Sequence, residues 1–181
     1  MIYEKIKKKI QNILTLKRDK IHYSNETYYR IIPFEWQIIL INDGSFTQNL
    51  NSLTGKCITS QVMNKLSYTL LENKNFRCVW LKDNNHNKLA YAKSLWLIEP
   101  NNYEEPIFSN GIPIGQSFIK SQIEIYKDLQ EIYYGYYENL EQQFHIQGPI
   151  WGRKYTVYHG DKSLGTIQEF FSPHIIHLLQ I

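Results

Sequence analysis

Two pairs of strand-like segments, each joined by a short polar turn, constrain the fold of this sequence more than any other feature. The first pair covers residues 76–81 and 89–98, and the second covers 154–159 and 164–171. Both pairs have the two-residue periodicity of a sheet. Short turns join antiparallel strands, whereas parallel strands need long crossovers, so we expect an antiparallel sheet. The predicted fold class is therefore α+β, with helices gathered on one side of the sheet.

Two further segments are strand candidates. Residues 57–66 follow the change towards a two-residue period, and residues 129–137 are rich in tyrosine, which favours strands. Glu and Gln residues flank the second segment. A helix over 122–142 is therefore an open alternative to that strand.

Helices are predicted mainly before the sheet. Residues 33–42 are expected to form one helix, opened by its proline. Ser45 is suited to cap a second helix over 46–53, which Gly55 would end. These two helices would form a helix-turn-helix cover, and a further short helix is expected over 114–119.

The first 32 residues are expected to lie outside the core. Isoleucines recur on one stripe of residues 1–15, which predicts a helix docked on the domain. A membrane-surface helix is the less favoured alternative, because the stripe is narrow. Residues 17–32 are polar and indicate a connection. With a core at 33–173, we expect one domain over residues 1–181.

Composition excludes several classes of protein. Hydrophobic residues make up 43% of the chain, as in globular proteins, and a net charge of +3 is too small to indicate nucleic-acid binding. No apolar run is long enough to span a membrane, and the charged N-terminus lacks the features of a signal or transit peptide. We expect Cys57 and Cys78 to be buried and reduced, and His174 with His177 to form a surface turn rather than a metal site.

Three ionisable residues share strand faces with apolar residues. Because side chains alternate across a strand, Arg77, Arg153 and Glu169 each fall on an otherwise apolar face. A charge in a core is costly unless it is paired or hydrogen-bonded. One interpretation is an Arg–Glu ion pair at a sheet edge. The other is a closed pocket between Arg77 and Glu169 that holds a small anion, since the planar arginine fork suits carboxylates.

Five short motifs follow one another along the chain: DGSFT at 43–47, FRCVWL at 76–81, IPIG at 112–115, GPIWGRKY at 148–155 and QEFFSP at 168–173. In this order they resemble the motifs of the chorismate pyruvate-lyases, most closely their cyanobacterial and plastid branch. The first and third resemble the family's two flaps, the second its arginine strand, and the last two its C-terminal signature. The resemblance extends from about Pro33 to Pro173.

The resemblance implies a six-stranded sheet with a buried site under helix-turn-helix flaps. It implies cleavage of chorismate to pyruvate and 4-hydroxybenzoate, a quinone precursor, without metal or cofactor. Carried over by position, Arg77 would bind the ring carboxylate and Glu169 would meet the hydroxyl end, so these two are the predicted catalytic residues. Phe46 and Ile114 would line the pocket and offer backbone groups. To these we add Arg153 as a second carboxylate contact.

Two other functions stay open. A domain of the same fold type would bind a small aromatic acid without catalysis, as the effector-sensing part of a regulator. The tyrosines at 133, 134, 136 and 137 would stack nucleic-acid bases, but no cluster of Lys or Arg accompanies them, which favours packing in the sheet. The expected partners are thus a small-molecule substrate and its product. We expect no nucleic-acid or membrane partner, and we expect the protein to be a monomer. The resemblance places the protein in a plastid that encodes it, or in a cyanobacterial-type cytoplasm.

Overall fold

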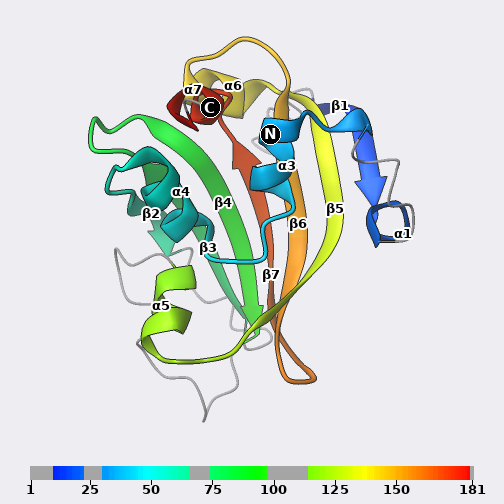
Figure 1. Cartoon of the computed structure of the whole chain (residues 1–181), viewed down its shortest axis with the longest axis vertical. Helices are drawn as coiled ribbons and strands as arrows, with labels where there is room; N and C mark the ends of the chain where they lie inside the picture. The colour runs from blue at the N-terminus through cyan, green and yellow to red at the C-terminus, as the bar shows by residue number, and fades with distance from the viewer. Residues whose placement is uncertain (1–9, 23–29, 66–73, 98–113, 180–181) are drawn as a thin grey trace, which may run out of the picture.

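Seven β-strands form one antiparallel sheet in the computed structural model (Figure 1). The structure describes residues 10–22, 30–65, 74–97 and 114–179. Across the sheet the strand order is β1-β5-β6-β7-β4-β3-β2. The strands are β1 (Ile10–Lys17), β2 (Thr59–Lys65), β3 (Lys74–Lys82), β4 (Lys88–Leu97), β5 (Tyr126–Tyr137), β6 (Ile150–His159) and β7 (Lys162–Phe171).

Both predicted hairpins are confirmed. β3 pairs antiparallel with β4, and β6 pairs antiparallel with β7 across a turn at Gly160. The φ angle of Gly160 is 55°, a left-handed conformation that glycine adopts without strain. The ambiguous segment at 129–137 is a strand, because β5 runs to Tyr137 and helix α6 (Glu138–Phe144) begins only at the next residue.

The strand at the N-terminal edge of the sheet corrects the sequence prediction. Residues 10–15, expected in a helix, belong to β1, which pairs with β5 and adds a seventh strand to the six expected. Ile10 and Ile13, which formed the helical stripe, are exposed, and Leu16 is the buried residue of the strand. Pairing with β5 provides hydrogen-bond partners for the backbone of residues 10–17. This stabilisation outweighs the tendency of the isoleucine stripe to form a helix. The rest of the predicted helix, residues 1–9, lies outside the described residues.

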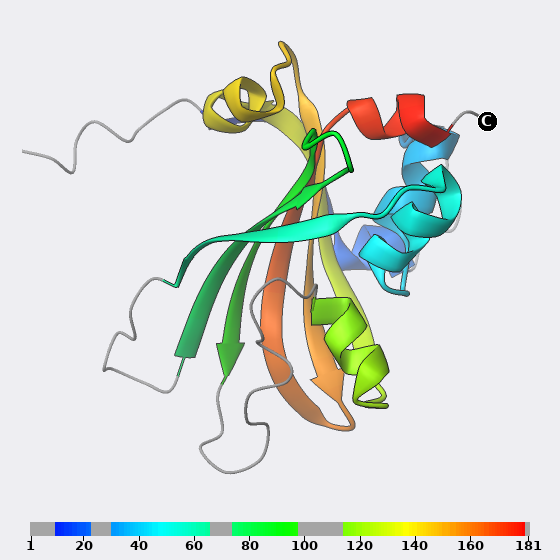
Figure 2. The same ribbon diagram turned by 90° about the vertical axis from the view of Figure 1, so that its left-hand side faces the viewer.

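The helices cover the two faces of the sheet unequally (Figure 2). α6 packs on one face, where the ring of Phe144 meets that of Trp80 edge to face, with centroids 5.4 Å apart. The expectation that the helices gather on one side is therefore corrected for α6. The other face carries α1 (Arg18–His22), α3 (Phe34–Leu40), α4 (Phe46–Thr54), α5 (Ile114–Lys120) and α7 (His174–Leu179).

Capping residues explain where the two cover helices begin and end. The Ser45 hydroxyl accepts a hydrogen bond from the Gln48 N–H (3.4 Å), and Gly55 ends α4 with a φ of 63°. Pro33 is the N-cap residue of α3 and not its first residue, so the helix begins at Phe34. The predicted helix-turn-helix cover is formed by α3 and α4.

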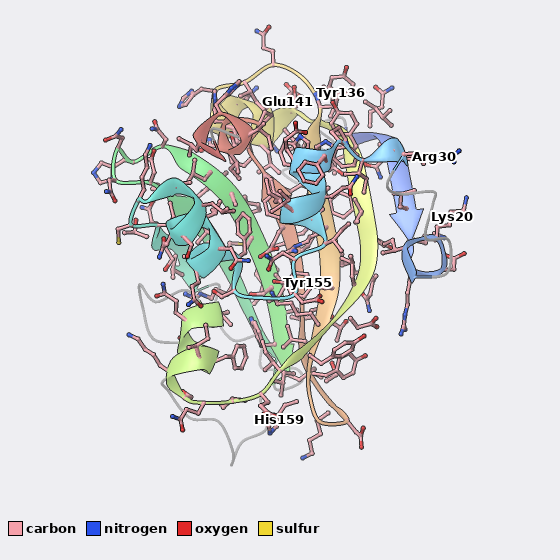
Figure 3. The ribbon with its side chains drawn as sticks, viewed as in Figure 1. Lys20, Arg30, Tyr136, Glu141, Tyr155 and His159 are labelled. Atoms are coloured by element: carbon pink, nitrogen blue, oxygen red, sulfur yellow. The ribbon has the colours of Figure 1, made fainter. Side chains whose placement is uncertain are left out.

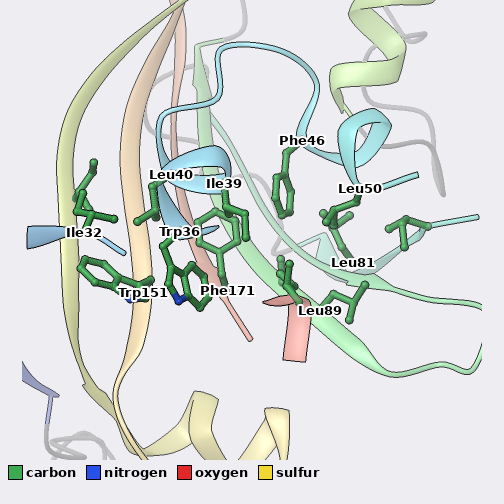
Figure 4. Close-up of a cluster of buried hydrophobic side chains, with 14 of the residues drawn as sticks. Ile32, Trp36, Ile39, Leu40, Phe46, Leu50, Leu81, Leu89, Trp151 and Phe171 are labelled. Carbon is green, nitrogen blue, oxygen red and sulfur yellow. The ribbon is translucent and has the colours of Figure 1, made fainter. Parts of the chain in front are cut away.

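A large apolar cluster fills the space between the sheet and helices α3, α4 and α7 (Figure 4). α3 supplies Trp36, α4 supplies Phe46, and β7 supplies Phe171. The rings of Phe46 and Phe171 meet edge to face with centroids 4.9 Å apart. Such a pair stabilises a protein by about 0.5–1.5 kcal/mol beyond its buried area. The cluster thereby fixes α4 over the sheet.

The predictions for the tyrosines of β5 are confirmed, whereas those for the cysteines and the C-terminal histidines are partly wrong. Tyr133 and Tyr137 are buried against Phe170, so their assignment to sheet packing is confirmed. Cys78 is half-buried, but Cys57 is exposed, so its expected burial is wrong. The two histidines near the C-terminus lie in α7 and not in a turn. No helix in the described ranges is long and apolar enough to cross a membrane.

Candidate active site

A cavity lies between the sheet and helices α4 and α5. β3, β4, β5, β6 and β7 form its floor. Most lining side chains are apolar; the polar ones are Ser45, Thr47, Arg77, Ser94, Lys127, Tyr155 and Glu169.

Arg77 provides a positive charge on the β3 side of the cavity. The residue is 6% exposed, and burial lowers the pKa of its guanidinium. Arginine nevertheless keeps its proton in proteins, so the charge persists at every accessible pH. Across the sheet, the Ser94 hydroxyl donates to the Arg77 carbonyl (3.4 Å) and accepts from the Trp96 indole (2.8 Å), which ties β3 to β4 at this point.

Glu169 on β7 provides the carboxylate of the cavity. Its Oε2 accepts a hydrogen bond from Arg153 Nε (2.7 Å), and its Oε1 accepts one from the Tyr155 hydroxyl (3.2 Å). Each carboxylate oxygen can accept more than one hydrogen bond, so both retain capacity for a ligand. The two protein donors fix the orientation of the carboxylate.

Arg153 supports Glu169 from outside the cavity lining. Its Nη1 donates to the carbonyl oxygens of Ile39 (3.0 Å), Leu40 (3.2 Å) and Asn42 (2.9 Å), at the end of α3. Although burial alone would lower the pKa of Arg153, the carboxylate of Glu169 raises it above its usual value. Arg153 is 1% exposed and does not line the cavity, which differs from the expectation that it contacts the ligand directly.

The sequence allowed two interpretations of the charged residues on apolar strand faces, a ligand pocket and an Arg–Glu ion pair, and the structure contains both. Four of the five residues predicted for the site line the cavity: Phe46, Arg77, Ile114 and Glu169. An Arg–Glu ion pair is also present, between Arg153 and Glu169. It joins β6 to β7 in the middle of the sheet and not at an edge.

Sequence reasoning missed Lys127 and gave Tyr155 no role. The Lys127 ammonium donates to the Gly44 carbonyl and lies 5.1 Å from the centroid of the Tyr155 ring. Tyr155 lies in the middle of the sheet, below the loop that follows α3 (Figure 3). Burial raises the pKa of the Tyr155 hydroxyl well above its usual value, so Tyr155 stays a neutral hydrogen-bond donor to Glu169. The expected strand began at residue 129, so the preceding lysine fell outside it.

The residues in this cavity and the order of the motifs point to one family, and a match to the model of that family establishes the membership. The model of the family described as chorismate pyruvate-lyase Rv2949c-like matches residues 40–179. The chain belongs to this family. The matched residues include every residue predicted for the site.

Relatives of this chorismate pyruvate-lyase-like chain include ycf21 proteins, which fit the plastid and cyanobacterial branch. The ycf21 protein of Antithamnion sp. is 42% identical over 173 residues, which are 94% of this chain and 96% of the relative. The ycf21 protein of Porphyra purpurea is 38% identical over 146 residues, covering 78% and 83% of the two chains. The likeness extends over most of the length of both relatives.

Solved structures of other proteins share the fold of this family member. PhnF from Mycobacterium smegmatis matches with a TM-score of 0.54 at 9% identity, covering 74% of this chain and 66% of PhnF. The isolated effector domain of PhnF matches with a TM-score of 0.53 at 9% identity, covering 72% and 90% of the two chains. At this identity the likeness concerns the fold alone.

The N-terminal ends of α4 and α5 lie close together beside the family member's cavity. A Cβ atom at Gly115 would lie 2.7 Å from Ser45 Oγ and 3.1 Å from Ser45 Cβ. Glycine is therefore needed at the start of α5 for the two segments to approach. Within the described residues, no three His, Cys, Asp or Glu side chains are grouped to hold a metal ion.

Proposed function

We propose that the protein is a chorismate pyruvate-lyase that converts chorismate to 4-hydroxybenzoate and pyruvate. The observation that carries the proposal is the placement of Arg77 and Glu169 in one largely apolar cavity. β4 separates their strands, so the strand axes lie about 10 Å apart. In register, Glu169 is aligned through Ala92 with Val79, two residues along β3 from Arg77. An aromatic acid with a hydroxyl opposite its carboxylate suits this pair.

The reaction depends more on how the substrate is oriented than on a strong acid or base in the site. The bond between the ring and the ether oxygen breaks, the hydroxyl-bearing ring carbon loses its hydrogen, and the enolpyruvate that departs becomes pyruvate on protonation. Formation of the aromatic ring makes the step strongly downhill. In our proposal Arg77 binds the ring carboxylate, and Glu169, held by Arg153 and Tyr155, accepts a hydrogen bond from the hydroxyl. Whether the proton passes to Glu169 or to the departing group distinguishes a general-base from a concerted step.

The apolar lining supports this function in a second way. Phe46 and Ile114, from α4 and α5, line the cavity on the side opposite the aliphatic residues of the sheet. Excluding water strengthens the contact between a carboxylate and Arg77 and holds the substrate in a reactive conformer.

The direct test is incubation of the purified protein with chorismate while 4-hydroxybenzoate and pyruvate are quantified by chromatography. We expect equimolar amounts of both products. Intact chorismate after prolonged incubation with folded protein would reject the proposal.

Replacement of Arg77 is expected to weaken binding more than turnover. Arg77→Met should raise KM for chorismate roughly tenfold to a hundredfold, because one charge-assisted contact to a carboxylate is lost, while kcat falls less. Steady-state kinetics separate the two constants. Arg18→Met is the matched control, since Arg18 pairs with Asp128 and is 61% exposed outside the cavity. Unchanged KM in the Arg77 variant would remove this residue from the site.

Separation of α5 from α4 is expected to impair the reaction without disturbing the sheet. Gly115→Ala should lower kcat/KM about tenfold or more, because the new methyl group collides with Ser45 and displaces α5 from α4. Gly44→Ala is the matched control, because a Cβ there would meet Asn42 Oδ1 at an ordinary 3.5 Å. Equal activity of the two variants would show that contact between α4 and α5 is irrelevant to turnover.

Ligand binding without catalysis is the second candidate function. The observation that favours it is the shared fold with the effector domain of PhnF, together with a cavity suited to a small acid. Tight binding of 4-hydroxybenzoate in calorimetry, with no turnover of chorismate, would support this candidate over the lyase. For either candidate we propose a plastid location, supported by the ycf21 relatives.

A further inference from the structure

Lys127 is a cavity cation to which the mechanism above gives no role. It lies near the start of β5, and Arg77 lies on β3. In the order β5-β6-β7-β4-β3 the two strands are four positions apart, about 19 Å at the usual strand spacing. Glu169 on β7 lies between them. The cavity therefore has a cation at each flank and a carboxylate in the middle.

The ammonium group of Lys127 has donors available for a ligand. Among the described residues it donates one hydrogen bond, to the Gly44 carbonyl, and it faces the ring of Tyr155. An ammonium group carries three N–H donors, so two remain. None of the ion pairs in the described part of the chain involves Lys127.

A charge at this position is unfavourable without an anion. Burial lowers the pKa of Lys127 to about 8, and Arg153 lowers it too, whereas Glu169 and Asp43 act in the opposite direction. Asp43 lies on the exposed loop before α4, where water and salt screen its charge. An apolar side chain would fill the same space without this penalty. The lysine therefore suits a cavity that receives a negatively charged group.

The one carboxylate that lines the cavity is already paired among the described residues. Glu169 forms its ion pair with Arg153, which lies beside the cavity and also donates from Nη1 to three backbone carbonyls. Lys127 lines the cavity and has no ion pair of its own in the described part of the chain. A negatively charged group of a ligand near β5 would compensate the charge of Lys127.

We propose that Lys127 binds the second carboxylate of a dicarboxylate substrate whose first carboxylate is bound by Arg77. The inference rests on the proposed lyase function, because chorismate carries one carboxylate on its ring and another on its enolpyruvyl ether. With the ring between Arg77 and Glu169, the ether side arm leaves from the carbon next to the hydroxyl. It then extends past Tyr155 towards β5, where Lys127 lies.

The test compares two unreactive ligands that differ in one carboxylate. The first, 3-(carboxymethoxy)-4-hydroxybenzoate, has the ring carboxylate, the hydroxyl and an ether-linked carboxylate. The second, 3-ethoxy-4-hydroxybenzoate, has a similar side arm without the charge. Calorimetry gives Kd of each for the wild type and for Lys127→Met, Lys127→Arg and the control Lys154→Met, whose residue lies on β6 outside the cavity lining.

We expect Lys127→Met to weaken binding of the dicarboxylate roughly tenfold to a hundredfold and that of the ethoxy ligand less than about threefold. Lys127→Arg should retain most of the affinity, and Lys154→Met all of it. Wild-type affinity for the dicarboxylate should also fall as the pH rises through about 8, where Lys127 loses its proton. The same loss for both ligands, or for neither, would overturn the role of Lys127.

These outcomes separate the inference from the proposed function. If the wild type prefers the dicarboxylate through Lys127 but leaves chorismate intact, the binding site for the second carboxylate stands and the lyase proposal fails. If chorismate is cleaved but Lys127→Met has an unchanged KM and unchanged ligand affinities, the lyase stands and the inference fails. If the wild type binds neither ligand, both are overturned.

Discussion

Glu169→Gln is expected to lower kcat for chorismate cleavage by about a hundredfold or more, the range in which positioned acid, base and orienting groups contribute. The amide preserves the shape of the side chain but removes the charge between Arg153 and Tyr155. It accepts a hydrogen bond through one oxygen only, so the contacts that orient the carboxylate cannot all be kept. The measurement is single-turnover kinetics on protein whose far-UV circular dichroism matches that of the wild type.

Two controls tell a loss of chemistry from a loss of structure. Glu131→Gln makes the same change on β5 outside the cavity lining and should leave kcat unaltered. The Glu169 variant should still bind 4-hydroxybenzoate within about tenfold of the wild type, since Arg77 keeps the carboxylate contact. A kcat within threefold of wild type would show that Glu169 is dispensable for turnover.

Arg153→Met is expected to destabilise the protein by about 3–5 kcal/mol, the usual effect of removing one partner from a buried ion pair. The substitution leaves the Glu169 carboxylate without its closest donor and removes the donor to three carbonyls at the end of α3. Domains of this size are stable by only about 5–15 kcal/mol, so the loss is a large fraction of the total. Urea unfolding followed by tryptophan fluorescence measures it.

The double variant Arg153→Met, Glu169→Gln isolates the charge pair. Because the Glu169 carboxylate is no longer left buried without Arg153, the double variant should be more stable than Arg153→Met alone. The coupling free energy follows from the four unfolding curves. Additive effects of the two substitutions would mean that Arg153 stabilises the fold mainly through the α3 carbonyls and little through Glu169.

The parts of the fold that depend on local signals were predictable from the sequence. Alternation and turn chemistry located both hairpins, and Ser45 and Gly55 bounded α4 within one residue. Projection of Arg77 and Glu169 onto apolar faces indicated a site because strand geometry fixes which residues share a face. A buried charge is rare enough to be informative even without a partner in sight.

The parts that depend on distant partners were not predictable. β1 is a strand because β5 offers it an edge, and nothing within residues 10–17 reports that edge. The partner of Glu169 was ambiguous because two arginines shared the sheet face, and only the register of β6 on β7 places Arg153 opposite it. Lys127 resembled a surface lysine, because its environment comes from Tyr155, Gly44 and the residues across the cavity.

The three carbonyls bound by Arg153 have a consequence for how the helical cover is held. They tie the backbone of residues 39–42 to β6, so a single side chain joins the end of α3 to the sheet. The same side chain orients the carboxylate of Glu169. The placement of the carboxylate and the attachment of α3 therefore depend on one residue, and neither can be altered through Arg153 without the other.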